Sequence, residues 1–497
     1  MRNRTIDAIV ALGIGLCTSS ICVLDARADD LPATEVAPQA ALRYEIEGIE
    51  FRGNTRTADS VIRRFVPFKS GDVLAVDDPE IEITRYRLLT AGFFSKVRVS
   101  LRRGRERGKA ILSIEVVERN TLIIDHISMG IAADEDKDGQ AELLSPYFGL
   151  GVAETNLAGR GMRLNAGVAV AADQWAMTTG FADPAIFKSK WSFDTSLYYV
   201  DGRDFFGTKD VSFESPLLSQ KTVTDYAIVD YTRFGGSIGG GRDLSLLTHL
   251  SFGYRLETVD AVVPVVASHV RGTTREPIRF HILGGKSVHS SLHAAIRYDS
   301  RNRPFLPTAG TVAALRGSLG LTPLGSNYGY QKFEAQYQRW WTLPWAHVIS
   351  LQSQIGVVHG DAPFFERFYV GDFAEALPGR ILGINPDRRQ PPNLFNTAIE
   401  EVRYGDYAAR LVTEYRVELY EGRSSIYGID LFGRVGLYSV MSHRDLTDAA
   451  TGYEGAARVP IDLTYNLGLR VETEVGGFSL GFSNLLGLLP ARGGDRK

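Results

Sequence analysis

The chain contains only two cysteines, Cys17 and Cys22, and both lie close to the N-terminus. A basic start precedes an apolar run there, and the Ala-Arg-Ala triplet at 26–28 fits a cleavage site, so we expect residues 1–28 to be an export signal. The bulky residue before Cys17 argues against a lipid attachment site. After cleavage no thiol remains for a disulfide, a metal site or nucleophilic catalysis. The Ala- and Pro-rich segment 29–42 is then expected to be a flexible lead-in.

Other features that are scarce or missing exclude whole classes of function. No apolar run after the signal is long enough for a membrane-spanning helix, although 44% of the residues are hydrophobic. A net charge of -3 lacks the large basic excess that dominates nucleic-acid binding. The sequence has no P-loop, HExxH or GxSxG pattern, and His281, His289 and His293 lie near no serine and acid that would complete a triad. We therefore expect no enzyme, no cofactor and no nucleic-acid partner.

The chain is rich in segments where apolar and polar residues alternate, and it contains 51 glycines and 21 tyrosines. The clearest such segments are 191–200, 411–420 and 427–438. One face of each is apolar and the other is polar, as expected for strands of an outer-membrane barrel with lipid on one side and a lumen on the other. The charged side chains expected to face the lumen are Glu414, Arg416, Glu418, Asp430 and Arg434.

A soluble β-sandwich would alternate in a similar way, so the choice of a barrel needs a second argument. Trp340, Trp341 and Trp345 flank a predicted turn, as an aromatic girdle at a membrane interface would. Backbone groups in lipid must also be paired, which requires the sheet to close. The sequence therefore predicts a mainly β protein whose transmembrane antiparallel barrel occupies residues 119–497.

The pattern in residues 43–118 predicts a small βααββ domain ahead of the barrel. A strand over 44–51 contains Gly48, which shifts the alternation by one residue and predicts a bulge. Thr57 is expected to cap a helix that runs to Phe65. The remaining expected elements are a helix over 79–91 and a hairpin with strands over 96–102 and 110–118.

Short motifs lie between the expected strands and helices of this domain: Gly53-Asn54, Gly71-Asp72 and Ala91-Gly92-Phe93-Phe94. With these motifs the domain resembles POTRA, and specifically the last POTRA domain of the BamA/TamA-like outer-membrane protein assembly factor family. The resemblance implies a periplasmic POTRA domain, followed by a bacterial surface antigen-type barrel of about sixteen strands in the outer membrane of a Gram-negative bacterium.

The barrel region carries further motifs that are similar to the same family. NLAGRG at 156–161 resembles its turn between two early strands, and FADP at 181–184 resembles the next turn. The family's strand-turn-strand motif is matched at Asp299, Arg301, Pro307 and Gly310.

The segment 361–410 is too long for an ordinary hairpin and is rich in aromatic residues. It resembles the family's sixth loop, which folds into the lumen and carries an arginine that pairs with acidic residues of the wall. Here Pro378 stands where that arginine is expected, and Arg380 follows Gly379. The resemblance implies that Arg380 supplies the guanidinium, with an exposed loop arginine as the alternative. Its candidate acceptors on the wall are Glu414, Glu418 and Asp430.

The C-terminus departs from the family pattern, because the chain ends LLPARGGDRK instead of in a strand with a terminal aromatic residue. Alternation alone gives about fifteen strands, whereas bacterial barrels usually have an even number. If the closing strand lies at 478–489, its seam with the first strand would be unusual.

An acidic stretch that begins at Asp134 matches the start of a calcium loop, including Gly139 at the sharp turn. The twelfth position is Ser145 instead of a bidentate glutamate, and the flanks are strand-like rather than helical. We therefore expect an acidic hairpin tip and no metal site.

The family resemblance implies a factor that receives unfolded barrel proteins through its POTRA domain and templates their insertion at the barrel seam. The implied partners are unfolded outer-membrane proteins, outer-membrane lipid and accessory periplasmic or lipoprotein subunits. An exposed strand edge could receive a chain by β-augmentation. The residues expected at that edge are Lys96, Val97, Arg98, Val99, Ser100 and Leu101. Two alternatives stay open: a transporter that secretes one partner protein, and a passive channel or surface antigen.

Overall fold

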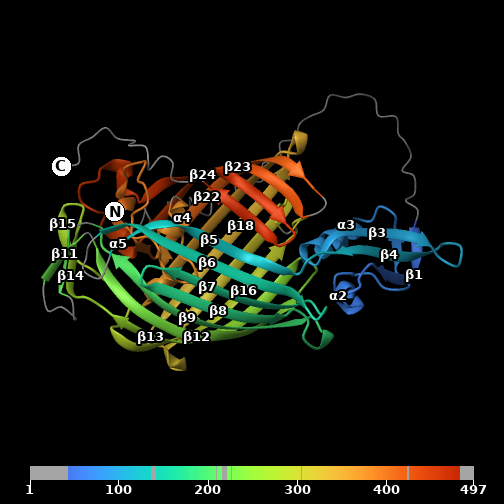
Figure 1. Ribbon diagram of the computed structural model, residues 1–497, viewed down its shortest axis with the longest axis horizontal. Coiled ribbons are helices and arrows are strands. Elements are labelled where there is room, and N and C mark those ends of the chain that lie inside the picture. The colour runs from blue at the N-terminus through green and yellow to red at the C-terminus, as the bar shows by residue number, and fades with distance from the viewer. Residues whose placement is uncertain are drawn as a thin grey trace.

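The structure is a computed structural model, and it describes residues 43–135, 141–208, 210–214, 221–224, 226–303, 305–375, 377–422 and 425–481. Figure 1 shows a small N-terminal domain beside one end of a large β-barrel. We call that end of the barrel the domain end. The predicted export signal and lead-in lie outside the described residues, as does most of the acidic stretch that resembles a calcium loop.

The N-terminal domain is a four-stranded sheet covered by two helices. Its sheet order is β2-β1-β4-β3, so β3 lies at an edge. β1 pairs in parallel with β4, and the register shifts between Ile46 and Gly48, which confirms the predicted bulge. The core contains the fully buried Ile62, Leu88 and Leu112. The elements are β1 (Arg43–Arg52), α2 (Asp59–Arg64), β2 (Val73–Ala75), α3 (Pro79–Thr90), β3 (Phe94–Arg103) and β4 (Lys109–Glu118).

The starts of the two helices differ in how well the sequence predicts them. α3 begins as expected, with Pro79 in its first turn and the Asp78 side chain accepting from the Glu80 N–H at 3.0 Å. α2 begins after Ala58, and no side chain caps it. The prediction that Thr57 caps α2 is wrong, because its hydroxyl accepts a hydrogen bond from the barrel instead.

The barrel contains 15 strands within the described residues, and neighbouring strands are antiparallel. The predicted fold class is therefore confirmed, with a count close to the expected sixteen. The strands are β5 (Leu122–Glu135), β6 (Ala141–Leu157), β7 (Met162–Ala171), β8 (Gln174–Asp183), β9 (Trp191–Phe206), β12 (Ala227–Asp243), β13 (Thr248–Val262), β16 (Gly285–Asp299), β17 (Gly310–Gly320), β18 (Tyr330–Thr342), β19 (Val348–Gly360), β22 (Tyr407–Glu421), β23 (Ile426–Met441), β24 (Ile461–Thr473) and β25 (Gly476–Gly481).

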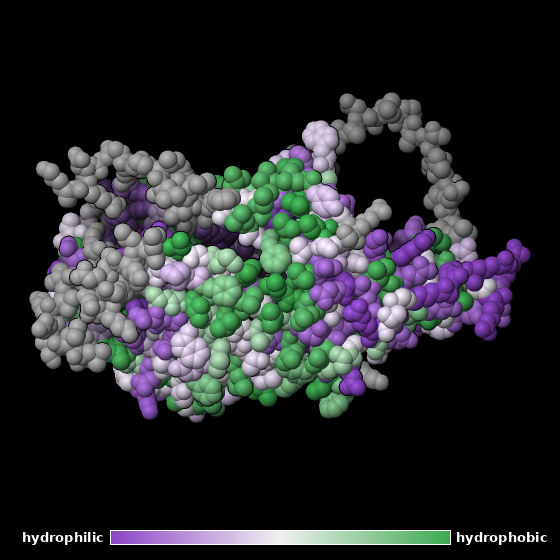
Figure 2. Space-filling model, viewed as in Figure 1, coloured by the Kyte–Doolittle hydropathy of each residue, from purple (hydrophilic) through white to green (hydrophobic). Residues whose placement is uncertain are grey.

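The two faces of the barrel wall differ as the alternation predicts. On β22, Leu411 and Tyr415 are 40% and 45% exposed, whereas Glu414 and Arg416 are buried in the lumen. Figure 2 shows hydrophobic residues gathered over the barrel strands, while the N-terminal domain is largely hydrophilic. A lipid-facing surface therefore surrounds a polar interior.

The predicted tryptophan girdle is only partly correct. Trp341 and Trp345 are exposed, but Trp340 is buried and packs with Val312 and Val348. Consecutive residues of a strand point to opposite faces, so Trp340 and Trp341 cannot both face lipid.

Smaller elements lie at the far end of the barrel and within it. A separate sheet has the order β11-β10-β14-β15. None of the helices among the described residues is both long and apolar enough to cross a bilayer. The smaller elements are β10 (Val211–Glu214), β11 (Lys221–Thr224), β14 (Val265–Arg271), β15 (Thr274–Pro277), β20 (Phe368–Tyr369), α4 (Gly371–Ala374), β21 (Tyr404–Gly405) and α5 (His443–Thr447).

Two adjacent valines of β4 allow a matched test of the N-terminal core. Val116 is 5% exposed and Val117 is 52% exposed. Val116→Ala should destabilise the domain by about 1.5–3 kcal/mol, because it removes buried methyl groups and leaves a cavity. Val117→Ala should change stability by less than about 0.5 kcal/mol. Amide hydrogen exchange of β1 and β4 in the full chain measures both, and equal effects would contradict the assigned faces.

Candidate functional site

The N-terminal domain contacts the barrel through the turn between β6 and β7. Asn156, at the end of β6, donates from Nδ2 to Thr57 Oγ1 at 2.9 Å. The Ala58 N–H donates to the Gly159 carbonyl at 2.9 Å. A Cβ atom on Gly159 would stand 2.0 Å from the Arg56 carbonyl oxygen, so this close approach requires glycine. The NLAGRG motif is therefore the turn that receives the N-terminal domain.

Glu118, at the end of β4, holds the segment that reaches the barrel. Its carboxylate accepts hydrogen bonds from Thr55 Oγ1 at 2.9 Å and from the Thr57 N–H at 2.7 Å. Burial alone would raise the pKa of Glu118, but these hydrogen bonds, with those of Thr57 first, outweigh burial and lower its pKa. Two arginines extend the contact: Arg64 pairs with Asp243 at 3.3 Å, and Arg87 Nη1 donates to Asp299 O at 3.2 Å.

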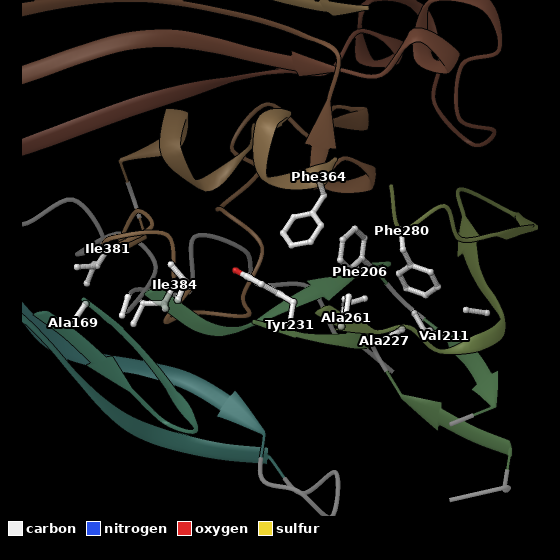
Figure 3. Close-up of a cluster of buried hydrophobic side chains, with 14 residues drawn as sticks. Ala169, Phe206, Val211, Ala227, Tyr231, Ala261, Phe280, Phe364, Ile381 and Ile384 are labelled. Atoms are coloured by element: carbon white, nitrogen blue, oxygen red, sulfur yellow. The ribbon is translucent and has the colours of Figure 1, made fainter. Parts of the chain in front are cut away.

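The segment between β19 and β22, which we call the lumen loop, packs inside the barrel. Figure 3 shows Phe364, Ile381 and Ile384 of this loop among wall residues that include Tyr231. The Phe364 ring lies 5.2 Å from the Tyr231 ring, measured between centroids, and Tyr231 donates to the Gly383 carbonyl at 3.0 Å. The loop occupies 361–406 and not 361–410, because β22 already pairs with β19 from Tyr407 onward.

Carboxylates of the lumen loop pair with basic residues of the wall. Glu366 forms an ion pair with Arg255 of β13 and lies 3.8 Å from Lys332 of β18. Glu375 pairs with Arg410 of β22 and with Arg434 of β23, the latter at 3.0 Å. The loop is therefore attached to four different strands, and the loop supplies the negative charges.

The start of the loop also rests on a buried network in the wall. The Arg233 guanidinium lies 3.8 Å from the centroid of the Phe365 ring. Arg233 Nε donates to Glu257 at 2.8 Å, and His289 Nδ1 lies 2.6 Å from the same carboxylate. Each charge in this network has an opposite charge or a hydrogen-bond partner, as buried charges require.

The predicted pairing of Arg380 with Glu414, Glu418 or Asp430 is wrong. Arg380 Nε and Nη2 both donate to Asp372 Oδ2, at 3.0 and 2.6 Å, within the loop itself. The Arg380 N–H, directly after Gly379, donates to Asp372 Oδ1 at 3.3 Å. The guanidinium also lies 5.6 Å from the Tyr369 ring centroid. Asp372 is eight residues away along the chain, so this local partner replaces a distant one.

The three predicted wall acceptors have other roles. Glu414 accepts two hydrogen bonds from Arg470, both at 2.7 Å. Asp430 lies 2.7 Å from Arg416 Nε. Glu418 is exposed, and the register of β22 and β23 shifts directly after it. The wall therefore neutralises its own acids and needs no loop arginine for them.

The strand-turn-strand motif lies at the domain end of the lumen, where Arg301 and Pro307 line a cavity with Glu414 and Arg416. Asp299 Oδ2 accepts from Arg301 Nη2 at 2.8 Å. Gly310 has a φ of 108°, and a Cβ atom there would stand 2.3 Å from the Ser300 carbonyl oxygen. The Pro307 carbonyl accepts a hydrogen bond from the buried Arg416. The four motif residues therefore shape one tight turn and anchor it to the wall.

The barrel seam lies between β5 and β25. Within the described residues, one backbone hydrogen bond crosses it, from the Ile124 N–H of β5 to the carbonyl of Val475, the residue directly before β25, at 2.6 Å. By contrast, β5 pairs with β6 from Leu122 to Glu135. Neighbouring strands are antiparallel, so the first and last of 15 strands point the same way. The seam is therefore the least paired junction in the described barrel.

The predicted substrate-binding residues 96–101 all lie on β3, the edge strand of the N-terminal sheet. Val97 points into the core, and Val99 and Leu101 pack against that core. Lys96 and Arg98 are exposed on the opposite face. Within the described residues β3 pairs only with β4, so its other edge is available to a further strand.

Sequence reasoning missed Asn156, Glu366 and Glu375. The two glutamates lie among aromatic and apolar residues of the loop, beside Arg367 and Asp372, and charges in such a stretch are a signal for buried partners. The sequence indicates Asn156 only as part of a turn motif, because its partner Thr57 is 99 residues away.

Comparison with known proteins agrees with this architecture. Residues 44–119 match POTRA, described as surface antigen variable number repeat, and residues 156–375 match the Omp85 superfamily domain. The outer membrane protein assembly factor BamA of Nitratidesulfovibrio vulgaris is 23% identical over 337 residues, which are 66% of this chain and 36% of that protein. The chain thus spans about a third of the length of this curated relative.

Two solved structures align with most of this chain. CdiB from Escherichia coli aligns with a TM-score of 0.50 and 11% identity, over 89% of this chain and 73% of that one. BamA from Haemophilus ducreyi lacking POTRA domains 1–3 aligns with a TM-score of 0.47 and 16% identity, over 88% and 80% of the two chains.

The docking turn predicts an effect of Asn156→Ala. Loss of the bond to Thr57 should weaken the contact by about 1–2 kcal/mol and broaden the range of domain orientations. Spin labels on cysteines substituted for Arg105 and Lys190 would report this as a wider distance distribution. Asn302→Ala is the control, since Asn302 bonds within its own turn to Thr308. Equal distributions for all three proteins would contradict a docking role for Asn156.

The ion pairs of the lumen loop predict an effect of Glu366→Gln. The change leaves Arg255 without its charged partner in the loop, which should weaken loop attachment by about 3 kcal/mol. Conductance in planar bilayers should then rise, because the loop leaves the lumen more often. Glu421→Gln is the control, since its pair with Arg303 at 3.3 Å is exposed and contributes little. Unchanged conductance of the first variant would show that other contacts hold the loop.

Proposed function

Because the chain belongs to the Omp85 superfamily, a family of outer-membrane β-barrel insertases and transporters, we propose that it inserts other barrel proteins into the outer membrane. The seam between β5 and β25, with its one backbone hydrogen bond in the described residues, is the observation that carries this proposal. In this proposal the POTRA domain lies in the periplasm and the substrate strand pairs at the seam.

The free energy of unpaired backbone groups supports insertion at the seam. An unpaired N–H or C=O group in hydrocarbon costs several kcal/mol, so a weakly paired strand edge in a membrane gains free energy from any strand that completes it. On β5, Ile127, Met129 and Ile131 are exposed on the lipid side. An incoming amphipathic strand would extend this apolar face while satisfying the free backbone groups. Burial of its own apolar side chains supplies the driving force, and no nucleotide is required.

The occupied lumen favours insertion over passage through the barrel. The lumen loop packs against the aromatic residues around Tyr231 and forms ion pairs through Glu366 and Glu375. A secretion transporter or a passive channel would have to break these contacts to open a path. Insertion at the seam leaves them in place.

The POTRA domain is suited to deliver a substrate to the seam. β4 ends at Glu118 and β5 begins at Leu122, so the docked domain lies at the base of the seam. We propose that the free edge of β3 receives an unfolded chain by β-augmentation. The proposed partners are unfolded outer-membrane proteins, membrane lipid and accessory periplasmic or lipoprotein subunits. The proposal contains no enzymatic step, no cofactor and no nucleic acid.

The experiment measures folding of a urea-denatured model barrel into liposomes that contain this protein. Liposomes with an equal amount of an inert porin provide the baseline. A disulfide between cysteines substituted for Ile124 and Val475, whose backbones share the seam hydrogen bond, locks the seam. A disulfide between cysteines at Thr121 and Thr155, which share a backbone hydrogen bond of 2.9 Å on the other side of β5, is the matched control.

We expect faster folding with the wild-type protein and with the control disulfide, and baseline folding with the locked seam until a reductant is added. No acceleration by a correctly folded wild-type protein would reject the insertase. Acceleration that survives the seam lock would reject the seam as its site. Conductance, or release of one secreted partner, would then decide between the channel and the transporter.

A further inference from the structure

A row of three small residues and three phenylalanines crosses the lipid face of the barrel on the side opposite the seam. The strand register places Phe193, Gly240, Phe252, Ala294, Gly317 and Phe333 side by side across β9, β12, β13, β16, β17 and β18. Because the glycines and the alanine have little or no side chain, the outer surface of the barrel is depressed between the phenylalanine rings of this row. β16 is the eighth of the 15 strands, counted from either edge. The row is therefore centred as far as possible from β5 and β25.

These small residues form the floor of an apolar groove with a volume of about 820 Å³. Its flanks are the exposed side chains of Ile238, Leu292 and Leu319, which project from the next row of the sheet. The groove crosses five strand spacings, or ~24 Å at about 4.8 Å each. Its size is that of a ligand pocket rather than a gap between two side chains.

The groove runs obliquely across the membrane. Gly240 lies three residues before the end of β12 at Asp243, which is at the domain end. Phe333 lies three residues after the start of β18 at Tyr330, which is at the far end. One end of the groove therefore opens close to the domain-end interface, and the other reaches the opposite half of the hydrocarbon layer.

A positive charge, Arg242, stands at the domain-end mouth of the groove. Arg242 is exposed, and its guanidinium lies 5.3 Å from the centroid of the Trp191 ring, which lines the groove. Within the described residues, no carboxylate lies within ion-pair distance of Arg242. A tryptophan and an arginine at the interface are the groups that meet lipid headgroups.

We infer that the groove binds one glycerophospholipid, with its phosphate at Arg242 and an acyl chain along the glycine- and alanine-lined floor. With the POTRA domain in the periplasm, as proposed above, this mouth faces the leaflet built from glycerophospholipids. An acyl chain matches the apolar lining, and a phosphate matches the unpaired guanidinium. The site goes beyond the proposed insertion activity, since it lies opposite the seam.

The test uses the full chain in detergent micelles that contain phosphatidylglycerol, with bound lipid counted by native mass spectrometry. Gly317→Leu fills the floor, and a Cβ atom there meets only the Phe333 ring at 3.5 Å, so the fold tolerates it. Gly433→Leu is the matched control, because Gly433 lies on the lipid face of β23, with Leu467 at 3.9 Å from its Cβ position. Heat-resistant migration of each variant verifies folding.

Gly317→Leu should lower retention of phosphatidylglycerol about tenfold, the effect of losing contact for roughly two buried methylene groups. Gly433→Leu should retain lipid like the wild type. Equal retention by all three proteins would overturn the groove as a lipid site.

Arg242→Gln tests the headgroup contact. It should weaken retention of phosphatidylglycerol but not of diacylglycerol, which has no phosphate. Equal loss of both lipids would overturn the assignment of Arg242. Retention of lipopolysaccharide in place of phosphatidylglycerol would overturn the choice of leaflet.

Discussion

The pairing of backbone hydrogen bonds in a medium without water is the constraint on which the rest of this structure depends. In hydrocarbon each strand must have a neighbour on both sides, and the antiparallel ladders from β5 to β25 provide this around the wall. Only the junction of β5 and β25 falls short, with one backbone hydrogen bond in the described residues. The docked POTRA domain stands at the base of that junction, because β4 leads into β5 within a few residues.

The interior follows from the same constraint. A strand that faces lipid on one side must place its polar side chains on the other, so the lumen collects charge. Arg416, 2% exposed, pairs with Asp430, and Glu414 pairs with Arg470. The surplus of wall arginines is neutralised by Glu366 and other carboxylates of the lumen loop. Ion pairs would hold the lumen loop equally well if the loop carried the positive charges and the wall the negative ones. The signs can therefore be exchanged while the loop stays in the lumen.

The sequence predicted well where neighbours along the chain carry the information. The two faces of 411–420 and 427–438 follow from a period of two, and the turn glycines follow from positive φ or close approach. Prediction failed where two plausible partners compete. Thr57 has a side chain suited to an N-cap, yet it bonds to Asn156. Arg380 is suited to the acids of the wall, yet Asp372 lies closer in the same loop.

The sequence by itself determined the mainly β architecture, a βααββ domain ahead of the barrel, the faces of the clearest strands and the presence of a long loop before β22. These depend on local alternation and on turn residues, whereas the POTRA identity and the lumen position of the loop came from the family resemblance. Only the tertiary structure decided which charges pair, where the domain docks and where the seam and the apolar groove lie. The reason is physical: Asn156 and Thr57, or Ala294 and Gly317, become neighbours only in the folded chain, and the alternation along one strand does not specify which residues lie on the next strand.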